Sequence, residues 1–227
     1  MNGFCLACSS DELRPTAANT RSTDFTCKSC DHRYELKTFE YRPAKSLVDG
    51  AYESMIARIL NGSAPTLLLL ERSSSWDVIS FSAINSVFLT PDIIDRRKPL
   101  SASARRAGWV GCNIRLDRIA SDGEVHIIKN GIVRAKQDSR NDFQRFLQLK
   151  ALKADKRGWT TLALSTVRSL GSNQFSLDEV YEKEQIFSSR FPDNHNIRAK
   201  IRQQLQVLRD LGYVSFDGRG HYSLIVS

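Results

Sequence analysis

The sequence predicts an α/β (α+β) domain built around a metal site, followed by a smaller, mostly helical domain. Before residue 150, strand-like segments with alternating apolar residues are mixed with a segment of helical periodicity. After residue 158, three helical segments precede two strand-like segments. Residues 153–158 contain one alanine and no other apolar side chain, which is typical of a linker. We therefore expect domains at 1–153 and 154–227.

The composition narrows the function before any motif is considered. Of 227 residues, 41% are hydrophobic and 26% are charged, which excludes a disordered or collagen-like chain. The longest apolar run, residues 67–70, is far too short to cross a bilayer, and the N-terminus lacks a secretory signal. We therefore expect a cytoplasmic protein. The net charge of +8 makes nucleic acid the leading partner.

The elements of the first domain can be taken in order. Residues 21–39 predict a hairpin of two short strands. Residues 46–60 carry apolar side chains at helical spacing, and Asn61 and Gly62 would end that helix. Further predictions are strands at 66–71 and 77–81, a hairpin of 124–128 with 132–134 around Asn130 and Gly131, and a helix at 141–153.

The second domain predicts a winged helix. Its first helix begins near residue 158, its second begins at Ser176 with the spacing of a capping box, and its third spans 196–211. Strands at 213–216 and 221–226 follow, joined by a glycine-containing loop with Arg219.

The third helix has the pattern of a recognition helix. Its buried stripe is Ile197, Ile201, Leu205 and Leu208. Its other faces carry Arg198, Arg202 and Gln203, which can enter a major groove, with Arg219 on the adjacent wing. Because Arg and Gln are common on any exposed helix, a simple solvent-facing surface is the alternative interpretation.

Four of the five cysteines form two pairs, Cys5 with Cys8 and Cys27 with Cys30. Two such pairs can complete a tetrahedral four-cysteine zinc site, which leaves no open position and is therefore structural. Two disulfides are the alternative, which a cytoplasmic setting disfavours. Cys112 is left over and is predicted to be a buried core thiol.

Asp24, Glu35 and Lys37 form the candidate catalytic group. On a strand, Glu35 and Lys37 share one face, and Asp24 can lie beside them if the preceding strand pairs with theirs. Asp24 and Glu35 could hold Mg²⁺, and the Lys37 ammonium could steady the charge of a reacting phosphate. This is the logic of PD-(D/E)xK nucleases. A chance surface ion pair is the alternative.

Residues 96–118 form a basic segment with seven Lys or Arg side chains and one acid, Asp117. It includes Arg105 and Arg106 and could face a polyanion or be a solvated loop. Trp109 could fill the core beside Cys112 or insert between base pairs.

Two long stretches carry a resemblance to a known family. Residues 98–114 and 201–210, with the glycine loop at 218–220 behind the second, closely resemble the DpnI-like methylation-dependent (type IIM) restriction endonucleases. The cysteine pairs, Asp24, Glu35 and Lys37 occur in the same order and context. The resemblance covers the chain from Cys5 almost to its end.

The resemblance implies a PD-(D/E)xK nuclease domain joined to a winged helix. It implies cleavage of duplex DNA at GATC when the adenine is methylated, with catalytic Mg ions on the acidic residues. It also implies that both domains read the methylated site and that Trp109 inserts among the bases. We expect a monomer. The alternative is a non-catalytic zinc and winged-helix protein, either a reader of methylated DNA or a transcription factor.

Overall fold

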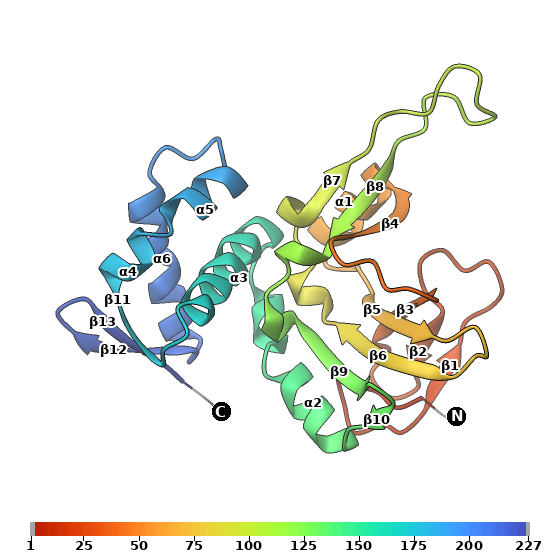
Figure 1. The fold of residues 1–227 in the computed structure, drawn as a ribbon, viewed down its shortest axis with the longest axis horizontal. Coiled ribbons are helices and arrows are strands. Elements are labelled where there is room, and N and C mark those ends of the chain that lie inside the picture. Colours follow the sequence, from red (N-terminus) through yellow and green to blue (C-terminus); the bar gives the residue numbers. More distant parts are fainter. Residues whose placement is uncertain (1–2, 226–227) are drawn as a thin grey trace. The chain divides into compact units, whose positions relative to one another are not determined.

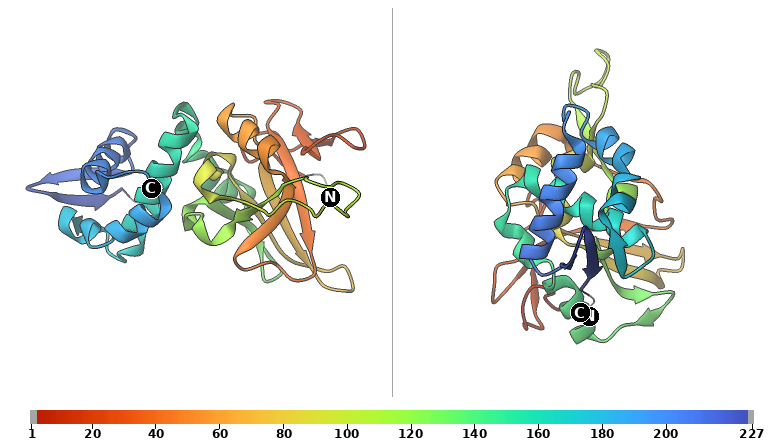
Figure 2. Two further views of the ribbon diagram at one scale, coloured as in Figure 1. Left: turned by 90° about the horizontal axis from the view of Figure 1, so that it is seen from above. Right: turned by 90° about the vertical axis from the view of Figure 1, so that its left-hand side faces the viewer.

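The computed structural model describes residues 3–225, and the contacts of the chain divide it into two units, 1–154 and 155–227 (Figure 1). Figure 2 shows both units from two further sides. No helix in the described range is both long enough and apolar enough to cross a membrane. Each unit is described by itself below.

The described residues of the first unit form a seven-stranded sheet in the order β1-β2-β3-β5-β6-β9-β10. Neighbouring strands are antiparallel except β3 and β5, which are parallel. The strands are β1 (Leu13–Pro15), β2 (Phe25–Cys27), β3 (Arg33–Phe39), β5 (Thr66–Arg72), β6 (Val78–Ile84), β9 (Glu124–Lys129) and β10 (Ile132–Val133). The predicted hairpin of β2 and β3 is therefore present, and β1 extends it.

The connection from β3 to β5 contains a strand and a helix, whereas the sequence predicted a single helix over residues 46–60. That prediction is wrong for its first part, because β4 (Ser46–Ala51) precedes α1 (Tyr52–Leu60). Leu47 is buried while Val48 is 60% exposed, which is strand alternation. The strand forms because β4 pairs with β8 (Gly111–Arg115), which also pairs with β7 (Ile94–Arg96). These partners lie far away in sequence, so local periodicity could not reveal them.

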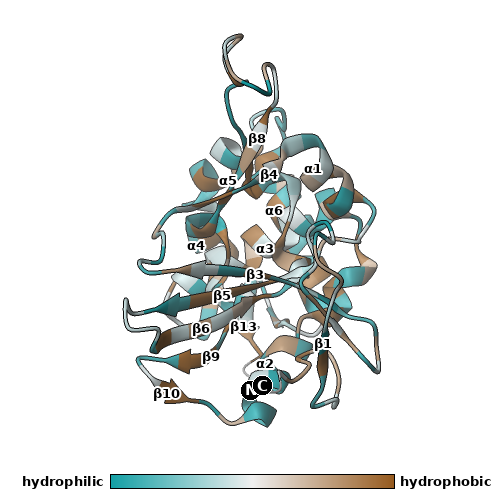
Figure 3. Cartoon of the chain, turned by 90° about the vertical axis from the view of Figure 1, so that its right-hand side faces the viewer, coloured by the Kyte–Doolittle hydropathy of each residue, from teal (hydrophilic) through white to brown (hydrophobic). Residues whose placement is uncertain are grey.

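The central strand β5 is buried on both faces. Leu67 and Leu69 join the hydrophobic cluster that contains Met55 and Ile59 of α1. Leu68 joins the cluster on the other face. This explains why β5 is a continuous apolar run rather than an alternating one, and Figure 3 shows hydrophobic colouring along β5 and β9.

The rest of the first unit is made of short elements. The hairpin of β9 and β10 turns at Asn130 and Gly131, both with positive φ, which confirms the predicted turn. The helix predicted at 141–153 is wrong in its bounds, because α2 (Lys136–Gln144) starts earlier and a short 3-10 helix, Leu147–Ala151, follows it. Four further 3-10 helices are Ser86–Phe88, Pro91–Ile93, Leu116–Arg118 and Ser121–Gly123.

The second unit has a three-stranded sheet beside four helices. Its elements are α3 (Ala154–Ser169), β11 (Gln174–Ser176), α4 (Leu177–Tyr181), α5 (Glu184–Arg190), α6 (Ile197–Asp210), β12 (Val214–Gly218) and β13 (His221–Leu224). The strands of this sheet lie in the order β11-β13-β12, and β12 and β13 form the wing hairpin. Residue 226, predicted to end the last strand, lies outside the described residues.

The linker predicted at 153–158 is helical, because α3 begins at Ala154. Arg157 and Trp159 are buried in this first part of the helix. A hydrophilic composition therefore did not indicate a flexible segment, since the long aliphatic stem of an arginine can pack against apolar neighbours.

Candidate functional site

The four paired cysteines lie together in the first unit. Their sulfur atoms all lie within 4.8 Å of one another, with 3.7 Å between Cys5 and Cys30 and 3.5 Å between Cys8 and Cys27. All four are free thiols. Four sulfurs at ~2.3 Å from one tetrahedral zinc ion are about 3.8 Å apart. The spacing therefore fits a zinc site, as predicted.

Local structure brings these thiols together. Cys27 ends β2, and Cys30 lies in the turn before β3, where the Asp31 amide bonds back to the Cys27 carbonyl at 3.1 Å. Burial alone would raise the pKa of Cys27, but the backbone amides of Ser29 and Cys30 lower it to about 6. Such amides stabilise the thiolate, which is the form that binds zinc.

The N-terminal pair is held against this turn by contacts from β3 and α2. The Tyr34 hydroxyl accepts the Leu6 amide at 3.0 Å and lies 3.2 Å from the Cys5 sulfur. From α2, the Arg140 guanidinium donates to the Cys5 carbonyl at 3.0 Å and pairs with Asp11 at 2.6 Å. The cysteine cluster therefore ties three separate segments of the first unit together.

A second polar cluster lies on the opposite face of β3. Lys37 Nζ contacts Glu35 Oε1 at 2.6 Å and Asp49 Oδ1 at 2.9 Å. Glu35 is 8% exposed, and the side chain of Asp49 is 7% exposed. Parallel pairing sets Glu35 beside Leu67 and Lys37 beside Leu69, so the cluster shares the sheet face covered by α1. We call Glu35, Lys37 and Asp49 the acidic cluster.

Asp24 lies beside β3, directly before β2. The paired register of β2 with β3 ends at Phe25 and Tyr34, and the Asp24 amide donates to the Tyr34 carbonyl at 2.8 Å. The exposed Asp24 carboxylate accepts the Leu36 amide at 2.7 Å through Oδ2. The structure thus places Asp24 next to the strand that carries Glu35 and Lys37, while its carboxylate is bonded to the backbone of that strand.

Electrostatics keep Lys37 protonated. Burial by itself would lower its pKa, but hydrogen bonds and charge attraction from Glu35 and Asp49 raise it. Two carboxylate oxygens of the acidic cluster, Glu35 Oε2 and Asp49 Oδ2, are buried without a hydrogen-bond partner. Buried charged oxygens are costly unless something binds them, so these two atoms are available to a cation or to water.

Sequence reasoning missed Asp49. It lies on β4, directly before α1, in a stretch that was predicted to be helical throughout. On a helix Asp49 would have had no reason to face Glu35. The pairing of Asp49 with Cys112 of β8 is what fixes its place, and no local signal in the sequence contains that pairing.

Residues 97–110 of the basic segment form a long hairpin loop between β7 and β8, which projects from the first unit (Figure 1). Arg105 and Arg106 are exposed in this loop. Trp109 is half-buried at its base, with the Arg106 guanidinium 4.6 Å from its ring centroid. A Cβ added at Gly111 would come within 2.9 Å of the ring, so Trp109 packs directly over this glycine.

The predicted recognition helix is α6. Ile201, Leu205 and Leu208 are buried as expected, and Ile197 is half-buried. Arg202 and Gln203 are exposed, as is Arg219, which has φ of 50° in the wing turn. Arg198 is also exposed and pairs with Glu184 of α5 at 2.7 Å. These side chains lie on the helix and wing that a winged helix presents to DNA.

Comparison with protein families decides the identity. A model of the DpnI, or Dam-replacing, family matches residues 1–152, and a model of the Dam-replacing HTH domain matches residues 155–224. The chain belongs to the Dam-replacing family. The resemblance found in the sequence is thereby confirmed, together with a mixed α/β catalytic domain and a C-terminal winged helix.

As a Dam-replacing family member, the protein is a type II methylation-dependent restriction endonuclease, and its substrate is methylated DNA. The rival interpretation, a non-catalytic reader or transcription factor, is disfavoured by this membership. Among residues 3–225, one set of three or more possible metal ligands has its donor atoms close together, and this set is the four paired cysteines. Asp24, Glu35 and Asp49 do not form such a group in this arrangement.

Proposed function

We propose that this endonuclease cleaves duplex DNA at GATC sites whose adenine carries a methyl group on its exocyclic amine, and that it requires Mg²⁺. The observation that carries the catalytic part is the acidic cluster, a buried pair of carboxylates sharing one ammonium, with the Asp24 carboxylate bound to the backbone of the same strand, β3. This combination is what phosphodiester hydrolysis needs: acidic ligands for a cation and a fixed positive charge.

The residues present fit Mg²⁺. Glu35 Oε2 has no hydrogen-bond partner, and Asp24 offers a second oxygen besides the one that accepts the Leu36 amide. Carboxylate oxygens are the preferred ligands of this ion. Mg²⁺ held there would neutralise charge on the reacting phosphate and orient a water molecule. Asp24 and Glu35 are the proposed ligands.

Lys37 would supply the second positive charge. Its raised pKa keeps it an ammonium at neutral pH, so it can contact a phosphate oxygen but cannot accept a proton. Asp49 holds the Lys37 ammonium independently of Glu35. Lys37 therefore keeps its place when the Glu35 carboxylate takes another partner, and Asp49 acts as a positioning residue.

DNA reading is divided between the two units in this proposal. Arg105, Arg106 and Trp109 on the hairpin loop would contact the duplex from the first unit. A methyl group adds only about 0.8 kcal/mol of apolar burial, so a single contact discriminates weakly. A second reading by Arg198, Arg202, Gln203 and Arg219 would multiply the discrimination.

Further features complete the proposal. Residues 1–153 form the nuclease domain of the PD-(D/E)xK type, and residues 154–227 form the DNA-binding domain. The cysteine cluster holds structural zinc, because four protein ligands leave no position for substrate. One chain carries both reading surfaces, so the enzyme acts as a monomer, and its free thiols suit the cytoplasm.

The test uses the full-length protein with adenine-methylated and unmethylated copies of one plasmid, with and without Mg²⁺. We expect fragments from the methylated plasmid alone, only with Mg²⁺, whose ends map to GATC. Equal cutting of both plasmids would overturn the methyl requirement. Ends at other sequences would overturn the GATC assignment, and cutting without a divalent ion would overturn the metal requirement.

A further inference from the structure

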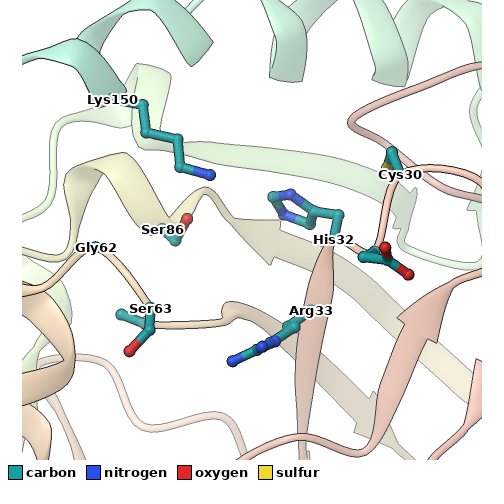
Figure 4. Close-up of a pocket in the computed structure, with 9 residues that line it drawn as sticks. Cys30, His32, Arg33, Gly62, Ser63, Ser86 and Lys150 are labelled. Atoms are coloured by element: carbon teal, nitrogen blue, oxygen red, sulfur yellow. The ribbon is translucent and has the colours of Figure 1, made fainter.

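A polar cavity of about 270 Å³ opens in the first unit beside the cysteine cluster (Figure 4). The start of β3, the turn before β5 and the short helix Leu147–Ala151 contribute to its lining. Arg33 and Lys150 approach it from two sides, as Figure 4 shows. We propose that this cavity binds a backbone phosphate of the DNA, next to the phosphate that is cleaved. The inference rests on the proposed nuclease site.

The two cations are available for a ligand. Within the described part of the chain, neither Arg33 nor Lys150 has a carboxylate within 4.0 Å, unlike Arg42, which pairs with Glu124. Asp31 also lines the cavity and is exposed. Two cations against one carboxylate leave a net positive charge, and an arginine with a lysine is a common donor set for phosphate.

The cavity has the chemistry of an anion site rather than a base pocket. Its lining includes Ser63 and Ser86 and few apolar groups. Pockets for larger organic ligands are mostly apolar and begin at roughly 300 Å³. A flipped base would meet no aromatic face here except the His32 ring, which already packs against Tyr34 and Phe143. A phosphate with its bound water fits this size and polarity better.

Strand geometry sets the cavity next to the acidic cluster. Arg33 and Glu35 are two residues apart on β3, so their side chains leave the same face of the sheet about 7 Å apart. Neighbouring phosphates along one DNA strand are separated by a similar distance. A strand whose scissile phosphate lies at Glu35 and Lys37 would therefore bring an adjacent phosphate to Arg33.

The experiment tests whether Arg33 and Lys150 contact one particular phosphate of the DNA backbone. Binding of the full-length protein to methylated GATC duplexes is measured by fluorescence anisotropy without added Mg²⁺. One duplex is unmodified, and each of the others carries one neutral methylphosphonate at a different backbone position. The proteins are wild type, Arg33→Ala with Lys150→Ala, and Lys129→Ala as a charge control. Lys129 is exposed at the end of β9, away from the cavity lining.

One methylphosphonate position should weaken wild-type binding roughly tenfold, as expected for a charged hydrogen-bonded contact. The same position should have little further effect on the double variant, because the contact is already lost. The double variant should also show a salt slope smaller by about 0.9, whereas Lys129→Ala should behave like wild type at that position.

Additive losses at every position would overturn the phosphate pocket. Equal effects of Lys129→Ala would reduce it to general charge attraction and also overturn it. The plasmid test separates this result from the proposed function, because cleavage can be intact when no position couples. If one phosphate position affects the wild type but not the double variant, and the protein never cleaves DNA, the phosphate-binding cavity is supported and the catalytic assignment is rejected.

Discussion

Two polar clusters occupy opposite faces of the same strand, β3, and they differ in how they are held. Tyr34 contacts the cysteine cluster on one face, and its neighbour Glu35 belongs to the acidic cluster on the other. The cysteine cluster is built from two short local segments, each contributing two cysteines that are separated by two residues. The acidic cluster joins β3 to β4, a contact made through the fold. Their different origins explain why only the first was complete in the sequence.

The arrangement also gives the two clusters different tasks. The cysteine cluster fixes the turn between β2 and β3, and thereby the pairing of these strands that holds Asp24 beside β3. The acidic cluster keeps two carboxylate oxygens, Glu35 Oε2 and Asp49 Oδ2, without a hydrogen-bond partner, so they are open to a ligand. Removing the first should therefore destroy structure, and altering the second should remove chemistry while leaving structure in place.

The largest effect is expected for Cys27→Ser. Structural zinc contributes on the order of 10 kcal/mol to folding, so its loss should unfold the first unit locally and abolish cleavage. Zinc by elemental analysis and a thermal melt measure this outcome. Cys112→Ala is the matched control, since Cys112 is buried in the core away from the cluster and its removal should keep the zinc. A wild-type protein free of zinc would contradict the assignment.

Asp24→Ala and Lys37→Ala should abolish cleavage and leave binding of methylated DNA nearly unchanged. A cation ligand and a fixed ammonium act on the transition state more than on docking. Plasmid cleavage and anisotropy on the same preparations measure the two properties. If binding and cutting fall together, these residues support the fold or the DNA contact instead of the reaction.

Local features of this fold were predictable from the sequence, and features that depend on distant pairing were not. The paired cysteines, the turn at Asn130 and the stripe of α6 are each encoded within a few residues. The pairing of β4 with β8 could not be predicted from the sequence, because the spacing of Leu47 and Ala51 fits one face of a helix as well as one face of a strand. Asp49 was missed for the same reason, while Glu35 and Lys37 lie two residues apart and could be paired directly.

Asp49→Asn should reduce kcat by roughly a hundredfold, with an unchanged Kd for DNA. The amide is close in size but lacks the charge that helps hold Lys37, so the ammonium would be left to Glu35 alone. Misplacing a catalytic group slightly costs about this much. The exposed Glu53→Gln, four residues along the chain, is the control and should have wild-type kinetics.

A purely structural role of Asp49 would give a different pattern. The melting temperature would then fall, and DNA binding would weaken together with kcat. An unchanged kcat would reject the positioning role outright.

Trp109→Ala should weaken binding and cleavage of methylated DNA, with a smaller loss of stability. A fully buried tryptophan would cost roughly 3–5 kcal/mol on truncation, but Trp109 is half-buried over Gly111. Its remaining surface and the stacked Arg106 are available to bases. Melting curves and tryptophan fluorescence with DNA measure the two effects. A large fall in melting temperature with no fluorescence response would place Trp109 in the core alone.

The smallest effect is expected for Ser176→Ala, which tests a purely local rule. The capping box predicted at this position is present: Ser176 Oγ accepts the Glu179 amide at 3.2 Å, and the Glu179 carboxylate accepts the Ser176 amide at 2.7 Å. Losing a cap of this kind costs about 1 kcal/mol. Ser188→Ala is the control, because that hydroxyl donates to the Gln185 carbonyl within α5 and caps no helix. Both variants should keep cleavage. A Ser176→Ala melt indistinguishable from the control would mean that packing against the rest of the unit, rather than the cap, determines where α4 begins.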